Sequence, residues 1–154
     1  MDYSRCLSRL QKLCSKAEYC SADIYRKALK DLEGDASEAS RIVASLVEDR
    51  YVDDARYASA FAREKSGIQG WGPIKIRFQL RAKGISDSVI SAALADIEPA
   101  RAADRLDKLV AAKARTLQGD PQIRLKLLKY ALGRGYPYED VEAAVKRSLE
   151  ISGE

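Results

Sequence analysis

Apolar residues along this chain recur every three or four positions, the spacing that places them on one face of a helix. Within 3–15, for example, Leu7, Leu10 and Cys14 share such a face. Further helices are expected over 22–33 and 99–117, and capping residues, glycines and prolines mark off six more. Alternating apolar and polar runs, which would favour strands, are missing. The pattern therefore predicts an all-α protein with nine helices.

Two stretches of the chain repeat the same order of a basic helix, a glycine and a second short helix. They are 73–94, "PIKIRFQLRAKGISDSVISAAL", and 124–145, "RLKLLKYALGRGYPYEDVEAAV", and they align without gaps when Gly84 is set on Gly135, 51 residues (135 − 84) further on. The pairs matched in this way include Lys75 with Lys126, Ile76 with Leu127, Lys83 with Arg134, Ile85 with Tyr136 and Ile90 with Val141. A period of this length built from helix–turn–helix units is typical of helical repeat proteins, which bind partners along a face.

The residues around the middle repeat have defined roles at helix ends. Pro73 suits a first helical turn, because its missing N–H would have no partner there. Gly84 is expected to take the left-handed conformation that closes the helix. Ile85 and Ile90 have the spacing of a hydrophobic staple. Ser21, Asp53 and Ser86 are the expected N-caps of the helices that follow them.

The repeat period predicts three tandem three-helix units, similar to helix-turn-helix modules, in an elongated and curved array. The predicted boundaries are 1–52, 53–98 and 99–154. The first unit matches least well, because it has no glycine at the corresponding place and needs a one-residue shift.

The residue types argue against catalysis. The chain has no histidine, the commonest general base and metal ligand. Cys6, Cys14 and Cys20 have neither zinc-site nor disulfide-framework spacing, and no phosphate-binding glycine loop or serine-hydrolase motif occurs. We expect a protein that is not an enzyme and that has no cofactor and no metal site.

The sequence also bears on location. No apolar run approaches the roughly 18–20 residues of a membrane span, and the first residues do not resemble a secretion signal. A cytoplasmic monomer without membrane contact is therefore expected.

Positive charge gathers on particular helices although the net charge is only +4. Six basic residues and one acidic residue lie within 63–83, and the same numbers lie within 113–134. Such helices suit a polyanion or an acidic protein groove, although solvated helix faces would also explain them. The candidate binding residues are Arg63, Lys65, Lys75, Arg77, Arg81, Lys83, Lys126, Lys129 and Arg134.

Two other features leave more than one interpretation open. Trp71, in the glycine loop before Pro73, fits a packing role between helices better than base stacking. A sequence-specific DNA reader would need amide side chains on its recognition helix, and the basic helix offers only Gln79.

Two motifs in the middle of the chain carry a resemblance to the RecX family of bacterial regulatory proteins. The first is "DDARYA" at 53–58, which has the family's D-D/E-x-R-[FY]-A pattern. The second is "GPIKIRFQLRAKGI" at 72–85, which has its G-x-x-[KR]-I-x-x-x-L-x-x-K-G-[IV] pattern. Segments 17–29 and 128–145 are similar to the family's first and last repeats, so the resemblance covers nearly the whole chain.

The resemblance implies a noncatalytic modulator of the RecA recombinase in DNA repair and homologous recombination. Family members bind in the groove of the RecA–single-stranded DNA filament, hinder its extension, and suppress its ATPase and strand exchange. The partner it implies is thus the RecA filament, with single-stranded DNA as a further candidate. The alternative is a free-standing DNA-binding regulator with helix-turn-helix units, which would act on a defined duplex site without RecA.

Overall fold

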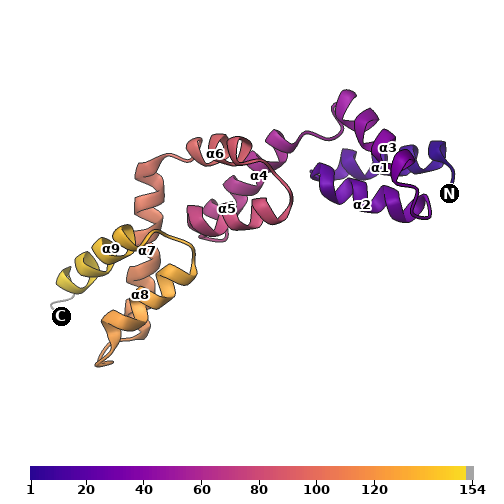
Figure 1. Ribbon diagram of the computed structural model, residues 1–154. Helices are drawn as coiled ribbons and strands as arrows, with labels where there is room; N and C mark the ends of the chain where they lie inside the picture. The colour runs from indigo at the N-terminus through magenta and orange to yellow at the C-terminus, as the bar shows by residue number, and fades with distance from the viewer. Residues whose placement is uncertain (152–154) are drawn as a thin grey trace. The chain divides into compact units, whose positions relative to one another are not determined.

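The computed structural model describes residues 1–151, which form nine α-helices and contain no strand (Figure 1). The all-α prediction is confirmed. In chain order the helices are α1 (Tyr3–Lys16), α2 (Ser21–Asp31), α3 (Ala36–Glu48), α4 (Asp54–Gly67), α5 (Pro73–Ala82), α6 (Asp87–Ala95), α7 (Pro99–Thr116), α8 (Ile123–Gly133) and α9 (Tyr138–Ile151).

The helices are grouped in two compact units. The first unit comprises 1–60 and 80–91, and the second comprises 61–79 and 92–154. Each unit therefore takes part of α4, α5 and α6. The division into three repeats at residues 52 and 98 stays a prediction, and the last three residues of its third repeat lie outside the part that the structure describes.

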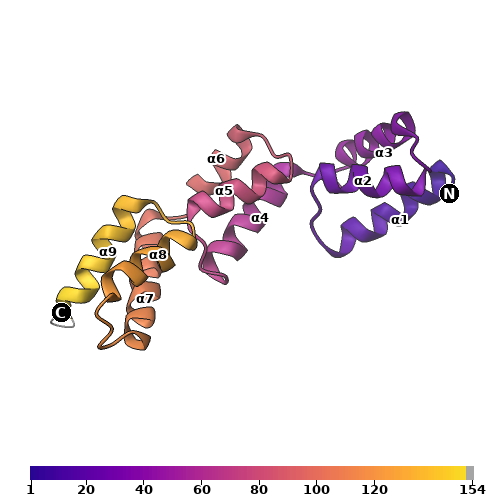
Figure 2. The same ribbon diagram turned by 60° about the horizontal axis from the view of Figure 1, so that its bottom comes forward.

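In the first unit, α1, α2 and α3 pack around one apolar core (Figures 1 and 2). Each helix presents one face to it, as the spacing of its apolar residues requires. The fully enclosed side chains include Leu10, Ile24, Ile42 and Leu46. Val52, just before α4, closes the core. At ~1.5–3 kcal/mol for each large apolar side chain, this burial is the main stabilising term of the unit.

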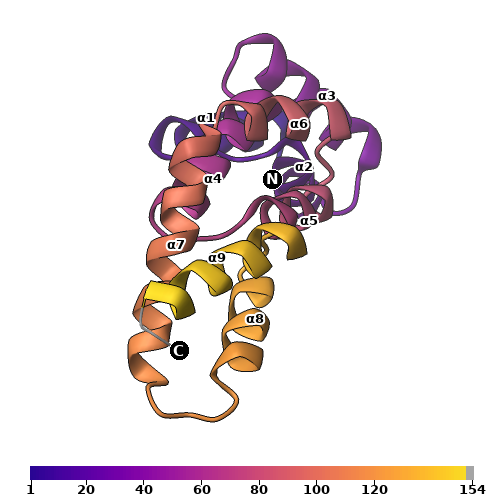
Figure 3. The ribbon, with the colours of Figure 1, turned by 90° about the vertical axis from the view of Figure 1, so that its left-hand side faces the viewer.

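In the second unit, α7, α8 and α9 pack around another core, and Figure 3 shows the three helices gathered together. Leu106 and Val110 come from α7 and Leu127 from α8, while Val141 and Val145 come from α9. Leu127, which the repeat matches to Ile76, is thus buried together with Ala131, which leaves the basic positions of α8 on its other faces.

The middle repeat has the buried positions that its sequence predicts. Ile76 and Leu80 on α5 are fully buried. Ile85 and Ile90 are buried as well, as a hydrophobic staple requires, and the hydroxyl of Ser86 accepts a 3.4 Å hydrogen bond from the N–H of Val89. The predicted cap of α6 is therefore present.

The predicted glycine corners are confirmed. Gly84 follows α5 with φ = +79° and Gly135 follows α8 with φ = +96°, in the left-handed region that favours glycine. The first repeat has no glycine at the place that matches Gly84, as the sequence indicates: α2 ends at Asp31, and Glu33 occupies the matched place with φ = +55°. Gly34 follows one residue later with φ = +87°. This is the one-residue shift that the alignment of the first repeat needs.

The expected cap of α2 was wrong, for a physical reason. Ser21 is the first residue of that helix and not its cap. Its backbone N–H and hydroxyl both donate to the carboxylate of Asp54, at 2.8 and 2.6 Å. A carboxylate from the start of α4 therefore accepts the hydrogen bond from the first N–H of α2, which a capping side chain next to the helix would otherwise accept. Asp53, in contrast, caps α4 as predicted, accepting from the N–H of Arg56 at 3.1 Å.

The two corner glycines should respond differently to alanine. At Gly84 an added Cβ would meet only the Cβ of Ala22, at 3.6 Å, so Gly84→Ala should cost the ~1–2 kcal/mol of the left-handed conformation. At Gly135 it would also come within 2.7 Å of the backbone nitrogen of Lys75, so Gly135→Ala should cost ~3 kcal/mol or more. Urea unfolding followed by circular dichroism measures both losses. Equal losses would contradict the close approach at Gly135.

Candidate binding surface

The predicted basic residues of the middle repeat lie on one helix and directly after it. Lys75, Arg77 and Arg81 are on α5, and Lys83 follows its last turn. Arg81 is exposed, and its Nε donates to a carboxylate oxygen of Asp87 at 2.7 Å. Lys75 and Arg77 are half-buried. The four cations are therefore not equivalent, and their neighbours decide what each can bind.

Lys83 connects two segments of the first unit by an ion pair. Its Nζ donates to a carboxylate oxygen of Asp23 on α2, at 2.8 Å, across 60 residues of sequence. Partial burial alone would raise the pKa of Asp23, but hydrogen bonds from Lys83 and Arg26 lower it on balance. The same hydrogen bond raises the pKa of Lys83. Lys83 thus contributes a fixed ion pair between the corner after α5 and the first turn of α2.

Arg134, which the repeat matches to Lys83, holds a similar joint inside the second unit. Its guanidinium donates to the carbonyl of Gln69, just before the glycine loop. The two backbones also meet directly: Gly72 donates its N–H to the carbonyl of Arg134 at 2.7 Å, and Ile74 donates to the carbonyl of Gly135 at 2.9 Å. The corner after α8 therefore rests on the start of α5.

Glycine is required on both sides of this joint. A Cβ at Gly72 would come within 2.6 Å of the backbone nitrogen of Tyr136, and Gly135 has no space for one either. The hydroxyl of Tyr136 adds a 3.2 Å hydrogen bond to the carbonyl of Gly70. The glycines of the "GWG" loop thus allow two backbones to touch, which is a stronger constraint than a simple turn.

The two other cations predicted on α8 differ from each other. Lys126 forms an ion pair with Asp120, whose pKa is lowered by the hydrogen bond from Lys126 and by a second one from the backbone of Gln122. Lys129 is exposed and has no ion pair or hydrogen bond with residues 1–151. Its matched position in the middle repeat is Phe78.

The remaining predicted residues, Arg63 and Lys65, lie in the last turns of α4, close to the glycine loop. Lys65 Nζ is 4.9 Å from the ring centroid of Trp71, and Lys75 Nζ is 4.4 Å from the same centroid. Phe61 meets the indole edge-on, with centroids 6.2 Å apart. Trp71 is therefore packed between side chains of α4 and α5, as the packing interpretation of the sequence requires, and it binds two ammonium groups through its π-system.

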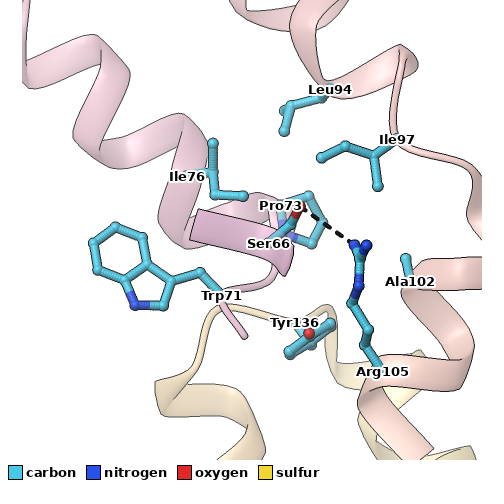
Figure 4. Close-up of a pocket in the computed structure, with 9 residues that line it drawn as sticks. All are labelled: Ser66, Trp71, Pro73, Ile76, Leu94, Ile97, Ala102, Arg105 and Tyr136. Atoms are coloured by element: carbon cyan, nitrogen blue, oxygen red, sulfur yellow. Dashed lines mark hydrogen bonds between the residues drawn. The ribbon is translucent and has the colours of Figure 1, made fainter. Parts of the chain in front are cut away.

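Behind Trp71 lies a cavity of about 140 Å³ that the sequence did not reveal (Figure 4). Its lining is mainly apolar, with the buried Ser66 accepting a 3.3 Å hydrogen bond from the guanidinium of Arg105. Its walls come from α4, α5, α6, α7 and the corner before α9. Because these segments are far apart along the chain, the local sequence pattern does not indicate the cavity, and none of the predicted binding residues lines it.

The acidic motif at the start of α4 has a structural role. Asp53 and Asp54 each accept hydrogen bonds at a helix N-terminus, and Arg56 donates to Glu18 at 2.6 Å and to the carbonyls of Arg50 and Tyr51. These contacts tie α4 to the end of α3 and to the loop before α2. Hydrogen bonding at two helix ends therefore explains this pair of aspartates.

Other chemistry finds little support among the residues that the structure describes. No group of three His, Cys, Asp or Glu side chains is placed to hold a metal ion. Burial raises the pKa of the Cys6 thiol to about 11, so this sulfur stays protonated at neutral pH. Within 1–151, no helix has both the length and the apolar composition that crossing a membrane requires.

Comparison with known proteins decides the family. A family model described as "RecX, second three-helix domain" matches residues 53–94, the stretch that carries both motifs. A regulatory protein RecX from Cronobacter sakazakii is 31% identical over 161 aligned positions, which cover 96% of this chain and 94% of that protein. The chain belongs to the RecX family. It is thus a member of a family of regulatory proteins, and its relatives are not named as enzymes.

More distant members agree over the same length. The regulatory protein RecX of Clostridium tetani is 26% identical, covering 99% of this chain and 71% of that protein. A crystal structure of a regulatory protein RecX superposes with a TM-score of 0.84 at 26% identity, over 94% of this chain and 71% of the other. RecX from Lactobacillus salivarius, at 18% identity, shares the fold with a TM-score of 0.82, covering 95% and 96% of the two chains.

The matched stretch is rich in residues that hold the fold. It contains the helix caps at Asp53 and Asp54, the tie at Arg56, and the corner with Lys83 and Gly84. The RecX motifs in this chain therefore identify joints between helices more than they identify a binding surface.

Asp23→Asn should weaken the first unit in a pH-dependent manner. The carboxylate has a lowered pKa, so its contribution is present above the unfolded pKa of about 3.9 and is lost as pH falls through the folded value. Lys83 has a raised pKa, so its contribution is present below about 10.4 and is lost only as pH rises through the folded value. The full effect is therefore expected from about pH 5 to pH 9.

Because the side chains are 22% and 38% exposed, the loss at pH 7 should be modest, ~1 kcal/mol or less. Urea unfolding of the parent and the variant at pH 7 and near pH 2.5 measures it, and the difference between the two proteins should become smaller in acid. Lys83→Met serves as the partner variant in a double-mutant cycle. A deficit of the same size at both pH values would contradict the ion pair.

Proposed function

We propose that this RecX-family chain binds the RecA–single-stranded DNA filament and reduces its ATP hydrolysis, its extension and its strand exchange. Membership of a family of regulatory proteins supports a regulatory role, and the resemblance of its motifs points to RecA as the partner. In this proposal the protein acts by occupying the filament and not by chemistry. The buried thiol of Cys6 and the helix-end carboxylates of Asp53 and Asp54 have structural roles.

The observation that carries the proposal is a division among the predicted cations. Lys83, Arg81 and Lys126 are neutralised by nearby carboxylates, and Arg134 is bound to a backbone carbonyl. Within residues 1–151, three cations near the glycine loop have no such partner: Arg63, Lys65 and Lys75. Their positive charge is available to a polyanionic filament, and all three belong to the second unit.

The alternative, a free-standing reader of duplex DNA, fits the described surface less well. The exposed side of α5 carries Ile74 and Phe78 beside its cations, and it offers a single amide, Gln79. Base-specific readout in the major groove uses arginine, asparagine or glutamine pairs on one helix face, and Arg81 is already paired with Asp87.

Titration into a reaction that follows single-strand-dependent ATP hydrolysis by the cognate RecA tests the proposal. We expect the parent to suppress hydrolysis. Lys65→Glu/Lys75→Glu should need at least tenfold more protein for the same suppression, because two attractive charges become repulsive. Lys12→Glu/Lys30→Glu, which makes the same charge change on exposed positions of α1 and α2, should stay within about twofold of the parent.

Thermal unfolding by circular dichroism checks that each variant is folded. No effect of the parent on hydrolysis at any concentration would contradict the proposed function. Tight binding of a defined duplex sequence in the absence of RecA would favour the free-standing regulator instead.

A further inference from the structure

The single tryptophan organises a cationic cluster in the second unit. The ammonium groups of Lys65, from α4, and Lys75, from α5, lie 4.9 and 4.4 Å from the indole centroid. Two ammonium groups that approach the same ring repel each other, and the attraction of each to the π-system of the indole offsets this repulsion. Trp71 itself is fixed, because its N–H donates to the carbonyl of Lys65 at 2.8 Å through the backbone and Phe61 contacts its ring.

Neither ammonium group has a carboxylate partner within residues 1–151. The lysine at the equivalent position of the last repeat, in contrast, does have a carboxylate partner. Lys126, which matches Lys75, forms an ion pair with Asp120 on the loop before its own helix. The position that matches Asp120 in the loop before α5 is Gln69, which carries no charge, and Lys65 and Lys75 face the ring of Trp71 instead. Both lysines therefore keep donors for a ligand. An ammonium group has three N–H donors, and a ring face takes up only part of them.

An exposed aromatic side chain lies next to this cluster. Phe78 is three residues after Lys75 on α5, and its side chain is 68% exposed. Ile74, one turn before Phe78, is 56% exposed, while Ile76 on the opposite side is fully buried. The solvent-facing side of α5 thus combines a cation with a large apolar surface that no described residue covers.

We infer that Lys65, Lys75 and Phe78 form a binding site for single-stranded DNA, with Trp71 holding the two ammonium groups in place. The lysines contact neighbouring phosphates, and a base stacks on Phe78. Cations that follow the backbone beside an exposed aromatic ring are the combination used by proteins that bind single strands without sequence preference. A polymer of acidic residues alone would use the charges but would offer no ring to stack on Phe78.

The inference rests on the proposed function and makes it more specific, because it assigns this face to the DNA of the filament and not to the recombinase. It also predicts binding without RecA, so the two claims can be tested apart. Trp71 is the chain's only tryptophan and sits in the cluster, and its fluorescence reports on this site alone.

The experiment is a titration of the full chain with an oligothymidylate of about 15 nucleotides, followed by tryptophan fluorescence at several salt concentrations. We expect saturable quenching. Lys65→Gln/Lys75→Gln should raise the dissociation constant at least tenfold and should make the salt dependence shallower by about 1.4 in log–log slope, since each phosphate contact on a single strand contributes ~0.7.

Matched variants separate the site from general charge and apolar effects. Lys126→Gln removes the repeat-equivalent lysine and should change the dissociation constant less than twofold, because that lysine is already paired. Phe78→Ala should weaken binding at least fivefold, whereas Tyr138→Ala, an aromatic residue on α9 that is 54% exposed, should leave it unchanged. Fluorescence anisotropy of a labelled oligonucleotide provides the same constants without relying on Trp71.

Four results would overturn the inference. The first is parental affinity in Lys65→Gln/Lys75→Gln. The second is an equal loss in Lys126→Gln. The third is DNA binding by anisotropy that leaves Trp71 fluorescence unaltered. The fourth is displacement of the oligonucleotide by polyglutamate at equal charge concentration, which would show an acidic-protein site instead. If the variants lost DNA binding while still suppressing RecA ATPase as the parent does, the DNA site would stand and the filament effect would be assigned to protein contacts.

Discussion

The close approach of two backbones, at the corner after α8 and the start of α5, is the constraint on which the second unit depends. Gly72 and Ile74 each donate an N–H to a carbonyl of that corner, and neither Gly72 nor Gly135 has room for a side chain. The first N–H groups of a helix have no partners within it, so these bonds also complete the start of α5. They fix the loop that carries Trp71, and through it the positions of the lysines around the indole. A structural joint thereby sets the geometry of the proposed binding face.

The repeated sequence assigns matched residues to different tasks. Lys83 and Arg134 occupy equivalent positions directly before the corner glycine. Lys83 connects its corner to the first turn of α2, and Arg134 connects its corner to the loop before α5. Lys75 and Lys126 are equivalent as well, but one faces an indole and the other a carboxylate. The pair at Lys126 is nearly neutral, while Lys75 retains its attraction for anions. A helical repeat can in this way keep one fold while the loop before the helix offers its lysine either an indole, from Trp71, or a carboxylate, from Asp120. That difference decides whether the cation is available for binding.

Much of the fold could be predicted because it depends on local chemistry. The left-handed glycines at 84 and 135, the staple pairs and the cap at Asp53 all lie within a few residues of the helix ends they define. In the first repeat Glu33 takes the left-handed conformation at the matched place and the glycine follows one residue later, and no residue preference indicates that Glu33 adopts this conformation. The candidate site could be predicted only as a set of basic residues. Which of them already have a partner depends on distant residues: Lys83 bonds to Asp23, 60 residues away, and Arg134 bonds to the carbonyl of Gln69, 65 residues away. Nothing in the local pattern shows such contacts.

The most direct test of this account is hydrogen–deuterium exchange of the full chain, alone and with preassembled RecA–single-stranded DNA filament. Exchange of backbone amides reports where a partner excludes water or restricts local opening. We predict added protection concentrated in 61–79, covering the end of α4, the glycine loop and α5, with little change in 1–50. Protection confined to α1–α3, or none anywhere in the presence of saturating filament, would contradict the account.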